Sequence, residues 1–263
     1  HWVWGGGFLA EMGLIDFAGG IVVHVTAGVS ALVLAMMLGP RRGFPHDVQP
    51  PHNPGMTMIG ASMLWVGWFG FNAGSALAAD GSATMAMTVT HLSAAAGAIA
   101  WSVMELIRYR KASLVGAVTG MVAGLATITP ASGSVGPVGG MLLGLAGGVV
   151  CYSMTQLIKQ RLKIDDSLDV FAVHGIGGAL GSLLVAFFVA SALGGRGLAD
   201  GMTMGSQLGV QAFGIVLVAI WSGVLTFIIV KVLKMFCKFR VDEETEVQGL
   251  DLAMHGERGY HGM

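Results

Sequence analysis

Seven long apolar stretches are the feature that most limits what this chain can fold into. Each approaches the roughly 20 residues that a helix needs to cross a hydrocarbon core about 30 Å thick. Charged residues make up only 11% of the 263, too few to cover the surface of a water-soluble domain. We therefore predict an all-α polytopic membrane protein with about seven transmembrane helices. They are expected at about 17–38, 56–78, 83–107, 113–129, 137–158, 168–192 and 206–236.

Basic residues gather in alternate connections between these stretches. Of the 14 lysines and arginines, all but Arg196 lie in or next to 39–54, 108–113, 159–169, 234–240 and the segment that follows. The positive-inside rule places such connections in the cytoplasm. The expected organisation is an external segment at 1–16, a transmembrane bundle at 17–236 and a cytoplasmic tail at 237–263, with the protein multi-pass in the cytoplasmic (inner) membrane.

Two of the predicted spans carry the same pair of polar residues. Asp16 precedes His24 by eight residues, and Asp166 precedes His174 by eight. Eight helical residues cover about 12 Å, and the two spans run in opposite directions, so both histidines approach the middle of the bilayer. Polar groups at that depth are costly and usually functional, and matched devices on antiparallel helices are typical of inverted-repeat transport proteins.

Three interpretations of His24 and His174 follow from the residues alone. Each ring could simply bond a neighbouring helix, the pair could relay protons or substrate near neutral pH, or it could hold a haem. His91 lies nearer the outer side and does not complete a haem site. Cys151 and Cys237 form no CxxC motif. We expect no cofactor, no metal, no catalytic residue and no nucleic-acid partner.

An aromatic cluster, LWVGWFGFNAGSA, lies toward the external end of the second span. Trp65, Trp68, Phe69 and Phe71 fit an interfacial aromatic belt, and Ser75 follows one turn after Phe71. Aromatic faces also attract small cations. The same residues therefore also fit a cation vestibule.

Asp16 and Trp4 lie on the same predicted external side. A carboxylate at a helix start bonds free backbone N–H groups, and we expect this to be the main contact of Asp16. The negative charge also favours cations at the external mouth. Trp4 is positioned to join the vestibule.

The C-terminal tail divides into two parts. VDEETE (241–246) fits a solvated acidic run, and GLDLAMHGERGY (249–260) fits a loop or short helix punctuated by glycines.

DFAGGIVVHVTAG, GWFGFNAGSA, TPASG, DVFAVHGIGG and GLDLAMHGERGY together resemble the ammonium transporter (Amt/Mep/Rh) family, on its bacterial Amt branch. The match runs through the whole chain but covers roughly the C-terminal three-fifths of such a protein. That family has an eleven-helix inverted-repeat fold, and this chain would supply the last helix of the first repeat, the second repeat and a long final helix. A start at HWVWGGG, without Met, suggests a fragment.

The resemblance implies roles for particular residues. His24 and His174 correspond to twin histidines that line a hydrophobic pore. Phe71 corresponds to the inner ring of a two-phenylalanine gate, whose outer ring this chain lacks. Trp4, Ser75 and Asp16 match an external ammonium recruitment site, with Trp68 as a candidate vestibule lining. The implied regulatory tail residues are Gly249, Asp251, His255, Gly256, Glu257 and Tyr260.

The implied function is ammonium transport, with recruitment and deprotonation outside followed by passage of ammonia along the pore. The resemblance also implies a homotrimer and a PII-type cytoplasmic regulator. An ammonium sensor that signals through the tail, a channel for another small neutral molecule such as carbon dioxide, and a haem-bearing electron carrier stay open. None of the leading interpretations is an enzyme.

Overall fold

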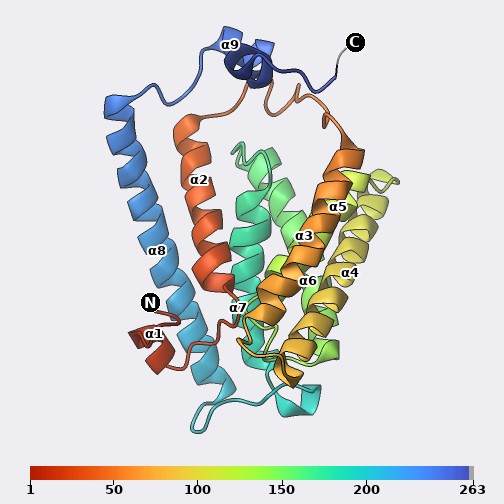
Figure 1. The fold of residues 1–263 in the computed structure, drawn as a ribbon, viewed down its shortest axis with the longest axis vertical. Helices are drawn as coiled ribbons and strands as arrows, with labels where there is room; N and C mark the ends of the chain where they lie inside the picture. Colours follow the sequence, from red (N-terminus) through yellow and green to blue (C-terminus); the bar gives the residue numbers. More distant parts are fainter. Residues whose placement is uncertain (261–263) are drawn as a thin grey trace.

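The computed structural model describes residues 1–260, which form helices joined by loops, without a strand (Figure 1). In chain order the helices are α1 (Phe8–Glu11), η1 (Gly20–Val25), α2 (Thr26–Leu38), α3 (Pro54–Gly74), α4 (Gly81–Tyr109), α5 (Leu114–Ile128), α6 (Pro137–Gln156), η2 (Leu157–Arg161), η3 (Phe171–Gly175), α7 (Ile176–Phe188), η4 (Ser191–Leu193), α8 (Met204–Phe236), α9 (Glu243–Gln248) and η5 (Asp251–His255). The η elements are π-helical turns, except for the 3-10 turn η4.

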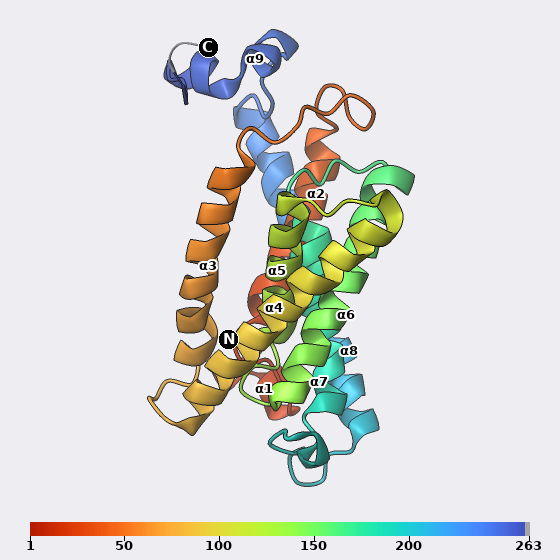
Figure 2. The same ribbon diagram turned by 90° about the vertical axis from the view of Figure 1, so that its right-hand side faces the viewer.

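Each of the seven predicted spans contains a helix, which confirms the all-α membrane architecture. Five helical stretches are long and apolar enough to cross a membrane: Gly20–Leu38, Gly81–Tyr109, Pro137–Arg161, Phe171–Phe188 and Met204–Phe236. α5 is apolar but has only 15 residues. α3 has 21 residues and packs at the edge of the bundle against α4 and α5 (Figure 2).

Helix starts follow from local capping chemistry. The Asn53 side chain accepts a hydrogen bond from the Met56 N–H (2.9 Å), and Pro54 occupies the first turn of α3, where its missing N–H costs nothing. Thr203 and Ser206 form a reciprocal capping box at α8. These bonds satisfy N–H groups that a helix start otherwise leaves free.

Close packing of small residues holds α4, α5 and α6 together. Their buried positions are mainly glycine, alanine and serine, and the Ser93 hydroxyl donates to the Gly124 carbonyl (2.8 Å). Small side chains let membrane helices approach closely. On the other side of the bundle, α2 packs against α8. α3 packs on α4 and α5 and stands away from α2, as the two ribbon views show (Figure 2).

The two ends of the bundle differ in charge. One end, uppermost in Figure 1, carries the connections 39–53, 110–113 and 162–170 together with the tail. We call it the basic end. The opposite end carries the N-terminal segment and the remaining connections, with Arg196 the one basic residue in them.

Candidate functional site

Asp16 holds the start of η1 through its carboxylate. One oxygen accepts from the N–H groups of Gly19 (3.1 Å) and Gly20 (2.6 Å), and the other from Ile21 (2.9 Å) and Val22 (3.1 Å). The residue is only 6% exposed. A buried carboxylate thus satisfies four N–H groups at once, and the helix dipole favours its charge.

Asp166 repeats this arrangement at the start of η3. Its oxygens accept from the N–H groups of Val170 (2.9 Å), Phe171 (2.8 Å) and Ala172 (3.4 Å). In both segments the carboxylate precedes a π-helical turn that contains the histidine. Wide π-turns are rare and occur frequently at functional sites.

His24 and His174 meet inside the bundle. Their Nδ1 atoms lie 3.1 Å apart, and the rings are tilted by 35°. Gly28 and Gly178, each four residues after a histidine, make this approach possible. A Cβ on Gly28 would overlap the backbone of Gly175, and one on Gly178 would overlap His24 and the backbone of Gly20. Glycine at both crossings lets each histidine's helix approach the other.

Thr129 determines the direction of the hydrogen bonds in this pair. Its hydroxyl donates its one hydrogen to the Leu125 carbonyl (2.7 Å) and accepts from Trp68 Nε1 (3.0 Å). His24 Nε2 lies 3.2 Å from the same oxygen, so that nitrogen must be the donor. His24 Nδ1 is then an acceptor, and His174 Nδ1 donates to it. These tautomers are assigned from the network.

Aromatic rings cover His24 on its α3 side. Trp68 stacks on the imidazole (5.4 Å between centroids), and Phe71 meets it edge-on (6.0 Å). Trp65 and Phe69 instead pack against His91. The aromatic cluster seen in the sequence therefore divides between two faces of α3.

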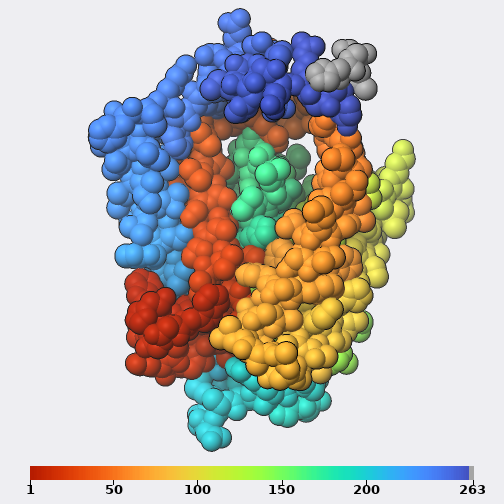
Figure 3. Space-filling model, viewed as in Figure 1, coloured from red at the N-terminus to blue at the C-terminus, as the bar shows by residue number. Residues whose placement is uncertain are grey.

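A hollow of about 650 Å³ lies between η1 and α3 and reaches the histidine. The space-filling view shows the surface hollowed between α2, α7 and α3, below the tail (Figure 3). The residues that line the 650 Å³ hollow are Val23, His24, Gly60, Met63, Leu64, Gly67, Trp68 and Phe71. Apart from His24 and Trp68 the lining carries no polar side chain.

The residues expected at the external mouth are only partly brought together. Trp4 Nε1 donates to the backbone carbonyl of Asp16 (2.7 Å), which joins these two residues. The Ser75 hydroxyl donates to the Phe71 carbonyl (2.8 Å). No hydrogen bond within 1–260 links Ser75 to Trp4.

Gln211 fixes the backbone beside Asp16, a role that the sequence did not suggest to us. Its amide accepts from the Ile15 N–H (2.8 Å) and donates to the carbonyls of Ile15 (2.7 Å) and Ser182 (2.9 Å). Gln207 adds a bond to the Gly13 carbonyl (3.0 Å). The sequence feature that could have indicated this role is the pair of glutamines, four residues apart, in an otherwise apolar helix.

The predicted tail residues lie at the basic end, away from the histidines. Gly249 (φ +92°) separates α9 from η5, and Gly256 (φ +68°) ends η5. Tyr260 stacks on His52 (5.2 Å between centroids) and contacts Asn53. The rest of the predicted set is Asp251 and His255 within η5, and Glu257, whose N–H donates to the Asp251 carbonyl.

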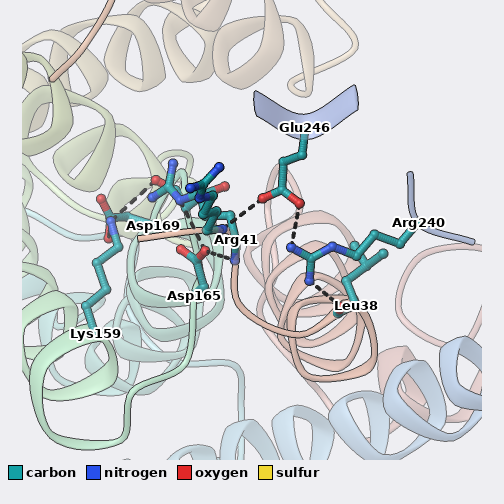
Figure 4. A network of polar contacts seen from close by, with 9 residues as sticks. Leu38, Arg41, Lys159, Asp165, Asp169, Arg240 and Glu246 are labelled. Atoms are coloured by element: carbon teal, nitrogen blue, oxygen red, sulfur yellow. Dashed lines mark hydrogen bonds and ion pairs between the residues drawn. The ribbon is translucent and has the colours of Figure 1, made fainter. Parts of the chain in front are cut away.

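Hydrogen bonds to the backbone of Leu38 and Arg42 connect the tail to the loop below it, and ion pairs lie on both sides of this contact (Figure 4). Arg240 pairs with Glu246 (2.7 Å) and donates to the Leu38 carbonyl, and Glu246 also accepts from the Arg42 N–H (2.8 Å). Arg41, the neighbouring residue, pairs with Asp165 (3.1 Å). Asp165 is adjacent to Asp166, the carboxylate that caps η3.

In residues 1–260, no three His, Cys, Asp or Glu side chains are placed to hold a metal ion together. The polar cluster around the histidines consists of hydroxyl, indole and imidazole groups. Its chemistry is that of neutral hydrogen-bond donors and acceptors in an apolar enclosure.

Comparisons with known proteins place this geometry in context. A family model described as "Ammonium Transporter Family" matches residues 1–260. A putative ammonium transporter of Methanothermobacter thermautotrophicus is 47% identical over 99% of this chain and 64% of its own length. An ammonium transporter of Bacillus subtilis is 43% identical over 99% and 64%. The chain therefore spans just under two thirds of these relatives.

Solved structures give the same picture. One described as "Sensor Amt Protein" superposes with a TM-score of 0.88 at 34% identity, covering 97% of this chain and 65% of that one. Saccharomyces cerevisiae Mep2 gives a TM-score of 0.80 at 35% identity, with coverage of 90% and 57%.

Proposed function

The chain belongs to the ammonium transporter family, and on that premise we propose that it forms the part of an ammonia conduit that contains His24 and His174. The observation that carries the proposal is their contact, 3.1 Å between Nδ1 atoms, next to an apolar hollow. A bare cation in such surroundings pays a large desolvation cost. Ammonium is therefore expected to lose a proton before it passes as neutral ammonia.

One histidine nitrogen is left to receive the ammonia. In the assigned tautomers His24 uses both nitrogens, one toward Thr129 and the other toward His174. His174 Nε2 has no hydrogen-bond partner within 1–260 and carries a lone pair. We assign it as the acceptor for an ammonia N–H.

The outer steps involve the opposite end of the bundle. Trp4 and Asp16 are joined there by a hydrogen bond, and with Ser75 they are the proposed recruitment site. Phe71 and Trp68 both contact the imidazole of His24 from α3, and Phe71 is one turn nearer to that end. They are proposed to act as the gate and as vestibule lining.

A sealed conduit needs a wall over the hollow between η1 and α3. The curated relatives are longer than this chain, and we propose that the additional polypeptide found in them supplies such a wall. A homotrimer in the cytoplasmic membrane, with the basic end in the cytoplasm, belongs to the same proposal.

The tail is proposed to regulate the conduit from the cytoplasm, together with a PII-type protein. Its contacts provide a physical route. Glu246 bonds Arg42, Arg41 pairs with Asp165, and Asp166 caps the turn that holds His174. A partner that moves the tail would act on the second histidine rather than the first.

Uptake measurements test the transport proposal. Methylammonium uptake and current are compared in proteoliposomes that contain the parent protein or the double variant His24→Ala/His174→Ala. We expect uptake to fall at least tenfold, since both polar groups of the apolar path are lost. His91→Ala, which alters another histidine in a helix, is the matched control. Wild-type uptake and current in the double variant would sink the proposal.

An ammonium sensor is the second candidate, favoured by the similarity to a structure described as a sensor. Binding and flux separate the two. Saturable ammonium binding, dependent on Trp4 and Asp16 but without flux, supports the sensor. Flux that depends on the histidine pair supports the transporter.

A further inference from the structure

The long helix α8 carries its polar side chains on one side. Between residues 207 and 230, its amide and hydroxyl side chains are Gln207, Gln211, Ser222 and Thr226. At about 100° per residue, these four positions lie within about 100° of one another around the helix. The glutamines bond the backbone next to Asp16, and the hydroxyls meet α2, which runs beside α8 (Figure 1). The polar side of α8 therefore faces the segment that carries His24.

Ser222 ties α8 to the first residue of α2. Its hydroxyl donates to the Thr26 carbonyl (2.9 Å). The Ser30 hydroxyl lies 2.9 Å from the hydroxyl of Ser222 and 2.9 Å from that of Thr226. Because Ser222 gives its one hydrogen to Thr26, it must accept from Ser30, and Ser30 then accepts from Thr226. The network therefore ends on a single backbone carbonyl, at the point where α2 begins.

Thr26 in turn stabilises the π-turn η1. Its backbone N–H donates to the carbonyl of Ile21, five residues back, as in a π-helix. In an α-helix the Val22 carbonyl would accept that N–H, and here it accepts the Thr26 hydroxyl (2.7 Å). The same hydroxyl lies 2.9 Å from the Val23 carbonyl. Thr26 thus bonds the two backbone carbonyls that directly precede His24.

The direction of the His24 ring depends on this turn. A π-turn contains one residue more than an α-helical turn. Converting it into α-helix would rotate the residues before it by about 100° relative to those after it. His24 Nε2 lies 3.2 Å from the Thr129 hydroxyl, and its Nδ1 lies 3.1 Å from Nδ1 of His174. A rotation of that size would not preserve both contacts.

The turn that carries His174 is built without these hydroxyls. Thr26 and Ser30 follow His24 by two and six residues, and the residues two and six after His174 are Ile176 and Leu180. The two segments are otherwise closely matched, so the hydroxyl network is a feature of the His24 segment.

We propose that Ser222 is a positioning residue for His24. It holds the Thr26 carbonyl, Thr26 holds the π-turn, and the turn directs the imidazole toward Thr129 and His174. Any consequence for uptake rests on the proposed transport function, whereas the position of the ring does not.

The tautomer of His24 tests this position, measured by ¹⁵N NMR of the histidine-labelled protein in detergent. In Ser222→Ala the ratio of Nε2-protonated to Nδ1-protonated His24 is expected to fall about fivefold, the weight of one hydrogen bond. Ser93→Ala is the matched control. It removes another buried hydroxyl that donates to a carbonyl of a neighbouring helix (2.8 Å), and it should leave the ratio unchanged.

Methylammonium uptake in proteoliposomes supplies a second readout. Ser222→Ala should lower the maximal rate about threefold, because a displaced polar group serves the path less well. The KM should stay within about twofold of the parent value, since the proposed recruitment residues Trp4 and Asp16 keep their contacts.

Two outcomes would overturn the proposal. One is the parent tautomer ratio in both Ser222→Ala and Thr26→Val, which replaces the second hydroxyl by a methyl group. The other is an equal fall in Ser93→Ala, which would indicate general loosening of the bundle. If Ser222→Ala does not fold, Thr26→Val carries the comparison with Ser93→Ala. A parent protein without uptake would refute the transport function, and the NMR ratios alone would then decide the role of Ser222.

Discussion

The segments around His24 and His174 are built alike but held differently. Each has a buried aspartate, a π-helical turn, a histidine eight residues on and a glycine four residues later. His24 is 3% exposed and bonded through both ring nitrogens, whereas His174 is half-buried and bonded through one. Both ring nitrogens of His24 are therefore hydrogen-bonded, whereas Nε2 of His174 has no partner among the described residues and can accept a hydrogen bond.

The contacts that hold the backbone of the two segments in place also differ. Gln211, buried in α8, bonds the backbone beside Asp16. The backbone beside Asp166 is tied by the partly exposed Arg41–Asp165 pair to a loop under the tail. The first segment is therefore anchored in the bundle interior, while the second is connected to the loops of the basic end.

The aspartates give the largest expected effect. Asp16→Ala leaves four N–H groups without their acceptor and should cost about 3 kcal/mol of stability, against about 2 kcal/mol for Asp166→Ala, which frees three. Thermal unfolding in detergent measures both. A larger loss of stability for Asp166→Ala than for Asp16→Ala would contradict the inference that the Asp16 segment is the more firmly anchored of the two.

Gln211→Leu is expected to cost about 2 kcal/mol, because one buried N–H and two buried carbonyls lose their partner. Gln248→Leu, at the exposed end of α9, is the control and should change stability by less than about 0.5 kcal/mol. Equal unfolding temperatures for the two variants would show that Gln211 does not anchor the Asp16 segment.

Thr129→Val tests the direction of the histidine hydrogen bonds and should cost about 1–2 kcal/mol. In the parent protein, ¹⁵N NMR of labelled histidine should show a protonated Nε2 on His24 and a protonated Nδ1 on His174. The variant should lose that preference. Thr127→Val is the matched control, since its buried hydroxyl also bonds back to its own helix but does not touch His24. A preference unchanged by Thr129→Val would contradict the assignment.

Arg41→Gln is expected to change stability by less than about 1 kcal/mol, because its ion pair is partly exposed. Its effect should be local. Hydrogen exchange should quicken in residues 165–172 and stay unchanged in residues 16–23. Faster exchange in both segments would remove the distinction between them.

The smallest effect concerns pH. The hydrogen bond from Arg240 holds the pKa of Glu246 below its usual value of about 4.3. A depressed carboxyl pKa adds stability above the unfolded value and loses it as the pH falls through the folded value. The protection against hydrogen exchange in 243–248, taken relative to the intrinsic exchange rate at each pH, should therefore stay constant from pH 8 to about 5 and fall only below about 4. In Glu246→Gln this protection should be low throughout.

Much of the fold could be predicted because its signals are local. Apolar length gives the spans, and counting residues along two antiparallel helices is enough to suggest that His24 and His174 approach the same depth. Helix ends are less well predicted: α3 begins at Pro54, capped by Asn53, rather than at about 56.

The remaining features depend on residues distant in the chain. In the sequence, Thr129 only marks the end of a predicted span. Its role follows from the fold, in which Trp68 and His24 both hydrogen-bond its hydroxyl oxygen. The split of the aromatic cluster depends on which face of α3 meets α4 and α5. Gly28 and Gly178 acquire their role only because the two helices cross there.

The Thr129 hydroxyl fixes the direction of the hydrogen bonds in the histidine pair. Leu125 takes its hydrogen, so the hydrogen bonds run from His174 to His24 and from His24 to Thr129. A proton passed along these bonds would reach the Thr129 hydroxyl, which would then have to give up its own hydrogen, and the Leu125 carbonyl that it faces is too weak a base to take it. The bonds therefore offer a relayed proton no exit at Thr129, whereas ammonia accepted at His174 Nε2 would pass without changing their direction.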